Sequence, residues 1–281
     1  MLRYSRRAGL ALALGATLAP FAPARARAQS KTKEYVVVDL GMLPGGDYSV
    51  GNAISNGGIV AGMAIAGNGS HAVKLQDLEL FQLGRDDEAS AANAVNDLGQ
   101  VAGFVSSAET NGQRATLWTD TGATDLGTLG GPFSIAHGLN GAGVVVGEST
   151  IADGVTTHAF RWQDGAMVDL GTLGGDASVA KAINDQGLVA GLSTTAPGQQ
   201  PYGPGSRAVL WGPDGLIDLG ALGGDVGAAA AINAQGWVAG GATTAPGIEY
   251  GAPGTHAFLW KEGEMFDLGA FDGADYSSAN G

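Results

Sequence analysis

The sequence predicts an all-β, β-propeller-like repeat fold of five to six four-stranded antiparallel blades, the last one incomplete. The first observation is a repeat: an Asp-Leu-Gly motif, degenerate in one copy, recurs at spacings of 43, 43, 44, 49 and 49 residues. Its first residues are Asp39, Gln82, Asp125, Asp169, Asp218 and Asp267. The second is that each full copy holds four short apolar runs. A single four-stranded sheet buries both faces only by stacking on neighbouring sheets.

The turn residues define the four runs, which in the clearest copy are 158–162, 166–170, 178–183 and 188–192. Asp164-Gly165 predicts a two-residue hairpin turn of type I′. The segment 184–187, Asn-Asp-Gln-Gly, predicts a type I turn closed by a left-handed glycine. The segment 171–175 is too rich in glycine for a helix and predicts a loop.

The copies divide the chain into a signal peptide at 1–28, a linker at 29–34 and a single repeat domain at 35–281. Copies are expected at about 35–70, 71–113, 114–157, 158–206, 207–255 and 256–281. The first lacks its first run and the last stops inside its third. Either the sequence is truncated or incomplete strands from both ends close a ring. The main alternative fold is a parallel β-helix, in which each strand pairs with its equivalent in the next copy.

The first 28 residues are typical of an export signal. Arg3, Arg6 and Arg7 precede an apolar run at 8–19, and Ala26-Arg27-Ala28 has the small-x-small pattern of a cleavage site. The arginine pair also fits a twin-arginine signal, so the export route stays open. We expect a mature protein that begins at Gln29 and is extracellular or periplasmic.

Composition excludes several partners. The segment 1–28 holds five of the 14 basic residues and none of the 27 acidic ones, so nine basic residues remain and the mature net charge is −18. Such a surface repels nucleic acid and anionic lipid. The chain has no cysteine, which excludes disulfides, thiolate metal sites and a lipid-anchored cysteine. No hydrophobic C-terminal anchor is predicted.

The strings HAFRW, HAFLW, DLGTLGG and AINDQGLVAG resemble the HAF family of probable extracellular repeats. The resemblance covers residues 35–281 in several copies. It implies a secreted β-repeat protein, and it implies no reaction and no assigned site residues.

Residues that recur in every copy are interpreted as structural. His or Arg stands eleven residues before each of the last four repeated aspartates, which predicts pairs such as His158 with Asp169 and Arg207 with Asp218, and a neutral version of His71 with Gln82. A recurring tryptophan, at Trp118, Trp162, Trp211 and Trp260, is expected to pack between blades. His137 stands at a variable position, matching Lys181 and Ala230, and is expected on the surface.

No cofactor is predicted. The Gly-Gly-Asp copies at Asp47, Asp176 and Asp225 offer carboxylate and backbone oxygens to Ca²⁺, but each loop holds a single Asp. No serine elbow, zincin motif or catalytic triad is visible, and no catalytic residue is predicted.

Two long connections, Ser193–Ser206 and Thr243–Thr255, set two copies apart and should emerge on one face of the fold. Their side chains supply the candidate ligand-binding residues Gln199, Gln200, Tyr202, Glu249 and Tyr250. Flat aromatic surface with amides suits an extracellular glycan or protein better than a phosphate. The alternative is that both are merely Pro/Gly-rich linkers.

The sequence therefore favours a non-catalytic binding, adhesion or structural module. The alternative function is a propeller hydrolase or lyase acting on carbohydrate. Two or more buried carboxylates gathered at one mouth of the channel would favour the enzyme.

Overall fold

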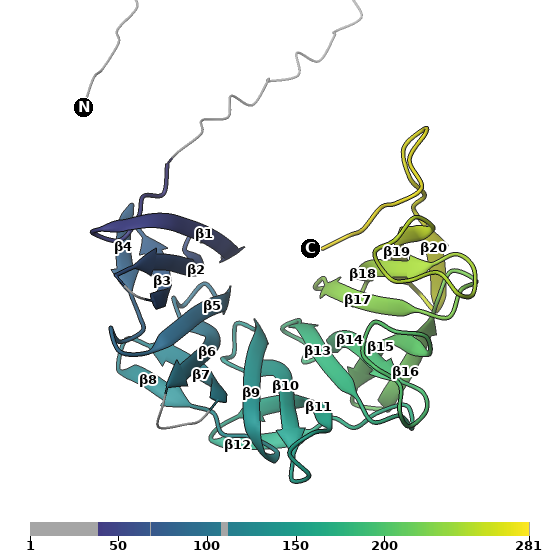
Figure 1. Cartoon of the computed structure of the whole chain (residues 1–281), viewed down its shortest axis with the longest axis horizontal. Coiled ribbons are helices and arrows are strands. Elements are labelled where there is room, and N and C mark those ends of the chain that lie inside the picture. Colours follow the sequence, from purple (N-terminus) through teal and green to yellow (C-terminus); the bar gives the residue numbers. More distant parts are fainter. Residues whose placement is uncertain (1–38, 68, 108–111, 281) are drawn as a thin grey trace, which may run out of the picture. The chain divides into compact units, whose positions relative to one another are not determined.

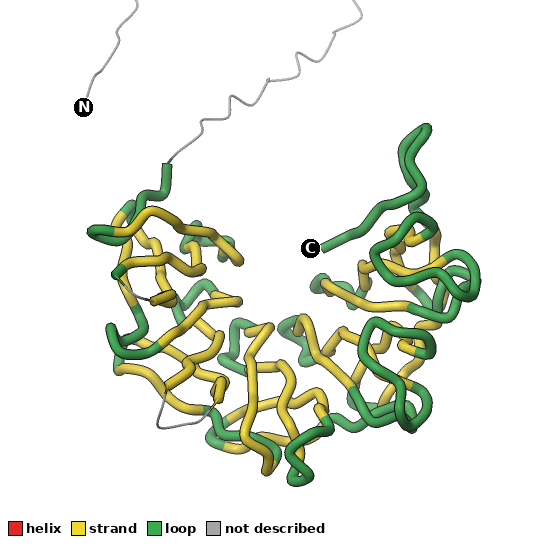
Figure 2. The backbone as a smooth tube through the Cα atoms, in the orientation of Figure 1, coloured by secondary structure: helices red, strands yellow, loops and turns green. Residues whose placement is uncertain are grey.

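The computed structural model describes residues 39–67, 69–107 and 112–280, and residues 40–281 form one compact unit. The expected signal peptide, the linker and most of the first apolar run lie outside the described residues. Strands and turns alone build the described part, as Figure 2 shows. No described segment is therefore a helix that could cross a membrane.

Twenty strands form five four-stranded antiparallel sheets within the described residues. The first sheet is β1 (Gly46–Ile54), β2 (Val60–Ala66), β3 (Gly69–Gln76) and β4 (Glu79–Gln82); the second is β5 (Ala89–Val95), β6 (Val101–Ser107), β7 (Gly112–Thr119) and β8 (Gly122–Asp125). The third is β9 (Gly130–Leu139), β10 (Val145–Ile151), β11 (Thr157–Gln163) and β12 (Ala166–Asp169). The fourth is β13 (Ser178–Ile183), β14 (Val189–Thr194), β15 (Ser206–Gly212) and β16 (Gly215–Gly220); the fifth is β17 (Gly227–Ile232), β18 (Val238–Thr243), β19 (Thr255–Lys261) and β20 (Glu264–Asp267).

This architecture confirms the predicted all-β fold of four-stranded antiparallel blades. Each described strand pairs with a neighbour in the chain, and none of the described strands pairs with its equivalent in the next copy, so the parallel β-helix alternative is wrong. Within the compact unit the five sheets follow one another in chain order and do not close into a ring (Figure 1).

The sheets are offset by two strands from the sequence copies. The fourth sheet, for example, takes β13 and β14 from the copy at 158–206 but β15 and β16 from the copy at 207–255. The long connections therefore join strands of one sheet, and the glycine-rich loops cross between sheets. A serine secures one such crossing: Ser178 Oγ accepts from Ala159 N at 2.9 Å and donates to Gly171 O at 2.8 Å.

Apolar clusters between consecutive sheets hold the stack together. Phe160 and Phe258 are fully buried at two of these contacts, and Trp118 and Trp211 are about as buried at two others. Trp162 and Trp260 pack against the same clusters. The expectation that the recurring tryptophan packs between blades is confirmed, because burial of so large a ring stabilises each stacking contact.

The innermost strand of each sheet carries a β-bulge. These strands are β1, β5, β9, β13 and β17, which line the inside of the arrangement in Figure 1. The pairing register skips one residue in each: Asn52, Asn93, His137, Lys181 and Ala230. A glycine of the second strand stands opposite, and a Cβ on Gly147 would lie only 1.9 Å from Ile135 O. A bulge redirects its side chain out of the regular alternation, so each sheet presents one residue inward.

Candidate ligand-binding site

The repeated aspartate shapes the loop that follows it. Asp169 Oδ1 accepts from Gly171 N at 2.7 Å, and Asp125, Asp218 and Asp267 bind the equivalent glycine amide. Asp169 Oδ2 also lies 2.7 Å from His158 Nδ1. The pairs of His256 with Asp267 and of Arg114 with Asp125 have the same arrangement, at 3.0 and 3.3 Å. These aspartates are thus occupied by structural contacts.

Two of the expected pairs are wrong. Arg207 does not pair with Asp218 but donates to Gly224 O at 3.4 Å. Strand β16 continues past Asp218, and its pairing with β15 has a register shift that the third and fourth strands of the other sheets lack. His71 Nε2 lies 3.3 Å from Ala66 O instead of meeting Gln82. The Gln82 amide is bound by Asp86, in the segment that replaces the Gly-Gly loop.

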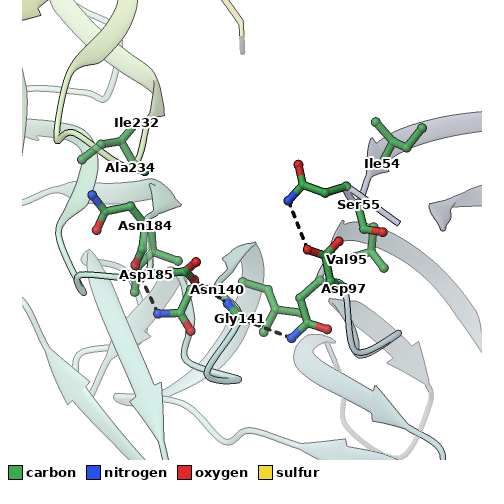
Figure 3. Close-up of a pocket in the computed structure, with 14 residues that line it drawn as sticks. Ile54, Ser55, Val95, Asp97, Asn140, Gly141, Asn184, Asp185, Ile232 and Ala234 are labelled. Atoms are coloured by element: carbon green, nitrogen blue, oxygen red, sulfur yellow. Dashed lines mark hydrogen bonds between the residues drawn. The ribbon is translucent and has the colours of Figure 1, made fainter. Parts of the chain in front are cut away.

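The face formed by the tight turns carries an asparagine ladder. Asn96 Nδ2 donates to Asn140 O, Asn140 to Asn184 O and Asn184 to Asn233 O, at 3.0, 3.2 and 3.0 Å. Each Oδ1 accepts two amides of its own turn. Asp97 and Asp185 bind the amides of Gly57 and Gly141 in the preceding sheets. Asn96, Asn140, Asn184, Asp97 and Asp185 line the depression in Figure 3, and they bind main-chain groups of neighbouring sheets, so we interpret this face as structural.

Side chains that depart from the repeat gather in a second place, which we call the inner cluster: His137, Glu148, Lys181, Tyr202 and Tyr250. His137 Nε2 lies 2.9 Å from Glu148 Oε1. Lys181 Nζ stands 5.8 Å from the centre of the Tyr202 ring, and the two tyrosine rings are 5.4 Å apart at 45°. Four of its members, all but Glu148, line a depression of about 420 Å³, together with Asn93, residues 228–230 and Asn280.

The two tyrosines come from the two long connections, so the predicted placement of these loops side by side is confirmed. Tyr250 packs on a small apolar cluster in the fourth and fifth sheets, and Gly241 leaves room for it: a Cβ there would lie 2.8 Å from the Tyr250 hydroxyl. Tyr202 has φ of 63°, a conformation that costs a non-glycine residue free energy. Burial raises the pKa of both phenols to about 12, so both keep their proton.

Glu148 is the acid of the inner cluster, at a position where the other sheets have Met63, Phe104, Leu192 and Gly241. Burial is the largest single influence and opposes its ionisation, but the hydrogen bond from His137 and the electrostatic attraction of His137 and Lys181 together outweigh burial and lower the pKa of the carboxyl. Burial lowers the pKa of His137 as well. The pair is therefore a carboxylate that accepts Nε2–H of a neutral imidazole, the tautomer assigned from this bond. The expectation that His137 lies on the surface is wrong, because the bulge places it against Glu148.

The other predicted site residues do not reach the inner cluster's depression. Gln199 folds back on its own loop, where its Oε1 accepts from Thr195 N and Ala196 N at 3.0 and 2.9 Å. Gln200 and Glu249 are exposed and do not line the depression. Of the five predicted residues, the structure brings Tyr202 and Tyr250 together.

Two of the three aspartates considered above as Ca²⁺ ligands, Asp176 and Asp225, differ in their contacts. Asp176 Oδ2 accepts from Gly198 N at 2.7 Å and holds the long connection against the glycine-rich loop, while Asp225 Oδ1 is buried without a hydrogen-bond partner. In the part of the chain that the structure describes, no three His, Asp or Glu side chains gather as metal ligands.

Sequence reasoning missed Glu148 and Lys181 as site residues. Glu148 could have been found by aligning the residue after each Val-Ala-Gly or Val-Val-Gly, where it is the single charged side chain. Lys181 and His137 could have been found as departures from Asn52 and Asn93 at the bulge position.

No family model matches the chain, and no curated protein matches it. Among solved structures, TolB from Acinetobacter baumannii superposes with a TM-score of 0.54 at 12% sequence identity. The match covers 78% of this chain and 53% of the TolB chain, so this chain matches about half the length of that neighbour. The likeness supports the β-propeller fold and nothing finer.

Proposed function

We propose that this protein is a secreted, non-catalytic repeat module that binds carbohydrate at the inner cluster. One observation carries the proposal: residues that break the repeat come from two bulges and two long connections and meet at one depression, where Glu148 of a second strand binds one of them, His137. Stacking of the sheets alone does not require such convergence.

The chemistry of the cluster favours a sugar. Tyr202 and Tyr250 offer rigid ring surface with polar tips, which suits the apolar face and the hydroxyl rim of a pyranose. His137 and Glu148 add hydrogen-bonding groups, and strands hold most of the site in place. The net charge of −18 predicted for the mature chain disfavours nucleic acid.

Binding is favoured over hydrolysis because, among the described residues that form the inner cluster, Glu148 is the single carboxylate. Glycoside hydrolases generally use a pair of carboxylates on either side of the scissile bond. The alternative, a carbohydrate hydrolase or lyase, is tested by mass spectrometry of bound glycans after incubation. Accumulating cleavage products would contradict the non-catalytic function.

Secretion is part of the proposal and is supported by the signal-like segment 1–28 and by the resemblance to the HAF repeats. We expect an intact mass that corresponds to a chain starting at Gln29 in extracellular or periplasmic material. A protein that retains Met1 would contradict export with cleavage.

The binding site is tested on a glycan array with the mature protein and the Tyr202→Ala/Tyr250→Ala variant. Removing both rings should weaken binding by about tenfold or more, since each stacked aromatic contributes on the order of 1 kcal/mol. Tyr48→Ala is the matched control, because Tyr48 is an exposed tyrosine of the first sheet. Binding that survives the double substitution would exclude the two rings as the site.

A further inference from the structure

We infer that the inner cluster selects a sugar acid, a glycan unit with one carboxylate, and that Lys181 Nζ is the group that binds this carboxylate. The inference rests on the proposed function and adds to it the charge and the orientation of the ligand.

The Lys181 ammonium has no direct ion pair with any described carboxylate. It lies at the bulge of β13 beside the Tyr202 ring. Glu148 attracts it electrostatically, but the direct partner of Glu148 Oε1 is His137. A partly buried ammonium without a direct partner is costly, and burial lowers the pKa of Lys181 accordingly. A ligand carboxylate would supply the direct contact that Glu148 does not make.

The surroundings of the Lys181 charge favour a ligand with a single carboxylate over a polyanion. The equivalent bulge residues Asn52, Asn93 and Ala230 are neutral, and Lys181 is the one lysine or arginine among the described residues that line the depression. The chain as a whole is strongly acidic. An isolated cation in a negative surface attracts a single carboxylate, whereas a densely charged polyanion meets repulsion from the surroundings.

The remaining groups orient the sugar. The tyrosine pair offers surface for the pyranose ring next to Lys181. With Nε2–H donated to Glu148, Nδ1 of the neutral His137 is an acceptor, which suits a sugar hydroxyl. The negative charge of Glu148 disfavours a second carboxylate at that end. The ligand should therefore bind with its acid group at Lys181 and its hydroxyl groups toward His137.

The test is calorimetric titration of the mature protein with two matched pairs of sugars: D-glucuronate against D-glucose, and D-galacturonate against D-galactose. In a pair that binds, we expect the acid to bind about tenfold or more tightly than the neutral sugar, as expected for a hydrogen bond to a charged group. Lys181→Met, which keeps the length of the side chain, should abolish this preference, so that the acid and the neutral sugar bind within about twofold of each other. Lys181→Arg should retain a preference for the acid.

The outcomes separate the two proposals. Equal affinity for acid and neutral sugar, or an acid preference that survives in Lys181→Met, would overturn the inference and leave carbohydrate binding standing. Failure of all four sugars and of the glycan array to bind would overturn the proposed function and the inference with it. Thermal melting of each variant verifies folding, and Lys181→Gln replaces Lys181→Met if that variant is unfolded.

Discussion

The face formed by the tight turns, here called the turn face, and the inner cluster are both built from positions of the same repeat. They differ in whether the side chains at these positions are kept from sheet to sheet. On the turn face, each asparagine makes the same bonds in successive sheets and its side chain is occupied by the fold. In the inner cluster, each residue differs from its equivalents and two charges stand close to the depression. Side chains that recur from sheet to sheet therefore stabilise the stack, whereas side chains that differ from their equivalents form the candidate binding site.

The bulge position shows both uses on equivalent residues. Asn52 Nδ2 donates to Ala92 O and Asn93 Nδ2 to Ala136 O, each at 2.9 Å, so these side chains link their sheet to the next one. His137 and Lys181 give up that link and turn to Glu148 and Tyr202. Among the described residues, the third and fourth sheets therefore lack the inter-sheet hydrogen bond that Asn52 and Asn93 make in the first and second.

The largest expected effect is on the turn face. Asn140→Ala removes an acceptor for two amides and a donor to the next sheet, so the free energy of unfolding should fall by about 3 kcal/mol. Urea denaturation measures it. Asn233→Ala is the control, since Asn233 makes the same bonds within its turn but donates to no other described residue, and it should cost clearly less. Equal losses would show that the ladder between sheets contributes little.

A smaller effect of opposite sign is expected in the inner cluster. His137→Asn with Glu148→Leu restores the side chains that the other sheets use, so the variant should gain about 1 kcal/mol in stability, as replacing a buried polar pair often does. It should also lose glycan affinity. A destabilised variant would show that the pair serves the fold, and the single variants measured in a double-mutant cycle give the coupling between them.

The pH dependence sharpens the same comparison. Since burial lowers the pKa of His137 below 6.5, the unfolded chain binds this proton before the folded chain does. Neutral His137 therefore leaves the folded state at full stability above pH 6.5, and its protonation destabilises the folded state as the pH falls below 6.5. Glu148, with a pKa lowered from 4.5, loses its contribution only in more acidic solution. Between pH 7 and 5 the wild type should lose more stability than the double variant, and parallel curves would contradict this.

The smallest effect is expected at the repeated aspartate. Asp169→Ala should lower stability by about 0.5 to 1 kcal/mol, a modest loss because 41% of the carboxylate side chain is exposed. Asp169→Asn keeps an acceptor for Gly171 N and loses the charge next to His158. The difference between the two variants in urea denaturation separates the loop contact from the pair. No loss in either variant would show that the repeated aspartate contributes little to stability.

The features that the sequence predicts well are those that follow from the repeat period and from local turn geometry. The hairpin turn at Asp164-Gly165 forms as predicted, with positive φ at both residues, and the two long connections bring Tyr202 next to Tyr250. The offset of sheets from copies was not predictable in this way, because the connection that crosses between sheets is fixed by packing. Each bulge arises because the first strand has one more residue than the paired stretch of the second strand, and neither strand alone shows this difference. Without the bulges, the directions of the His137 and Lys181 side chains cannot be predicted.

The offset between sheets and copies has a consequence for how such a chain changes length. Every boundary between copies falls in the middle of a sheet. Each sheet is therefore built from two strands of one copy and two strands of the next, and no copy forms a complete sheet by itself. Excising one full period from mid-sheet to mid-sheet removes two half-sheets and leaves two matching halves that pair again. Gene duplication or loss in units of one period therefore preserves the hydrogen-bonding pattern, whereas partial unfolding of one copy opens two sheets and makes the unfolding of neighbours cooperative.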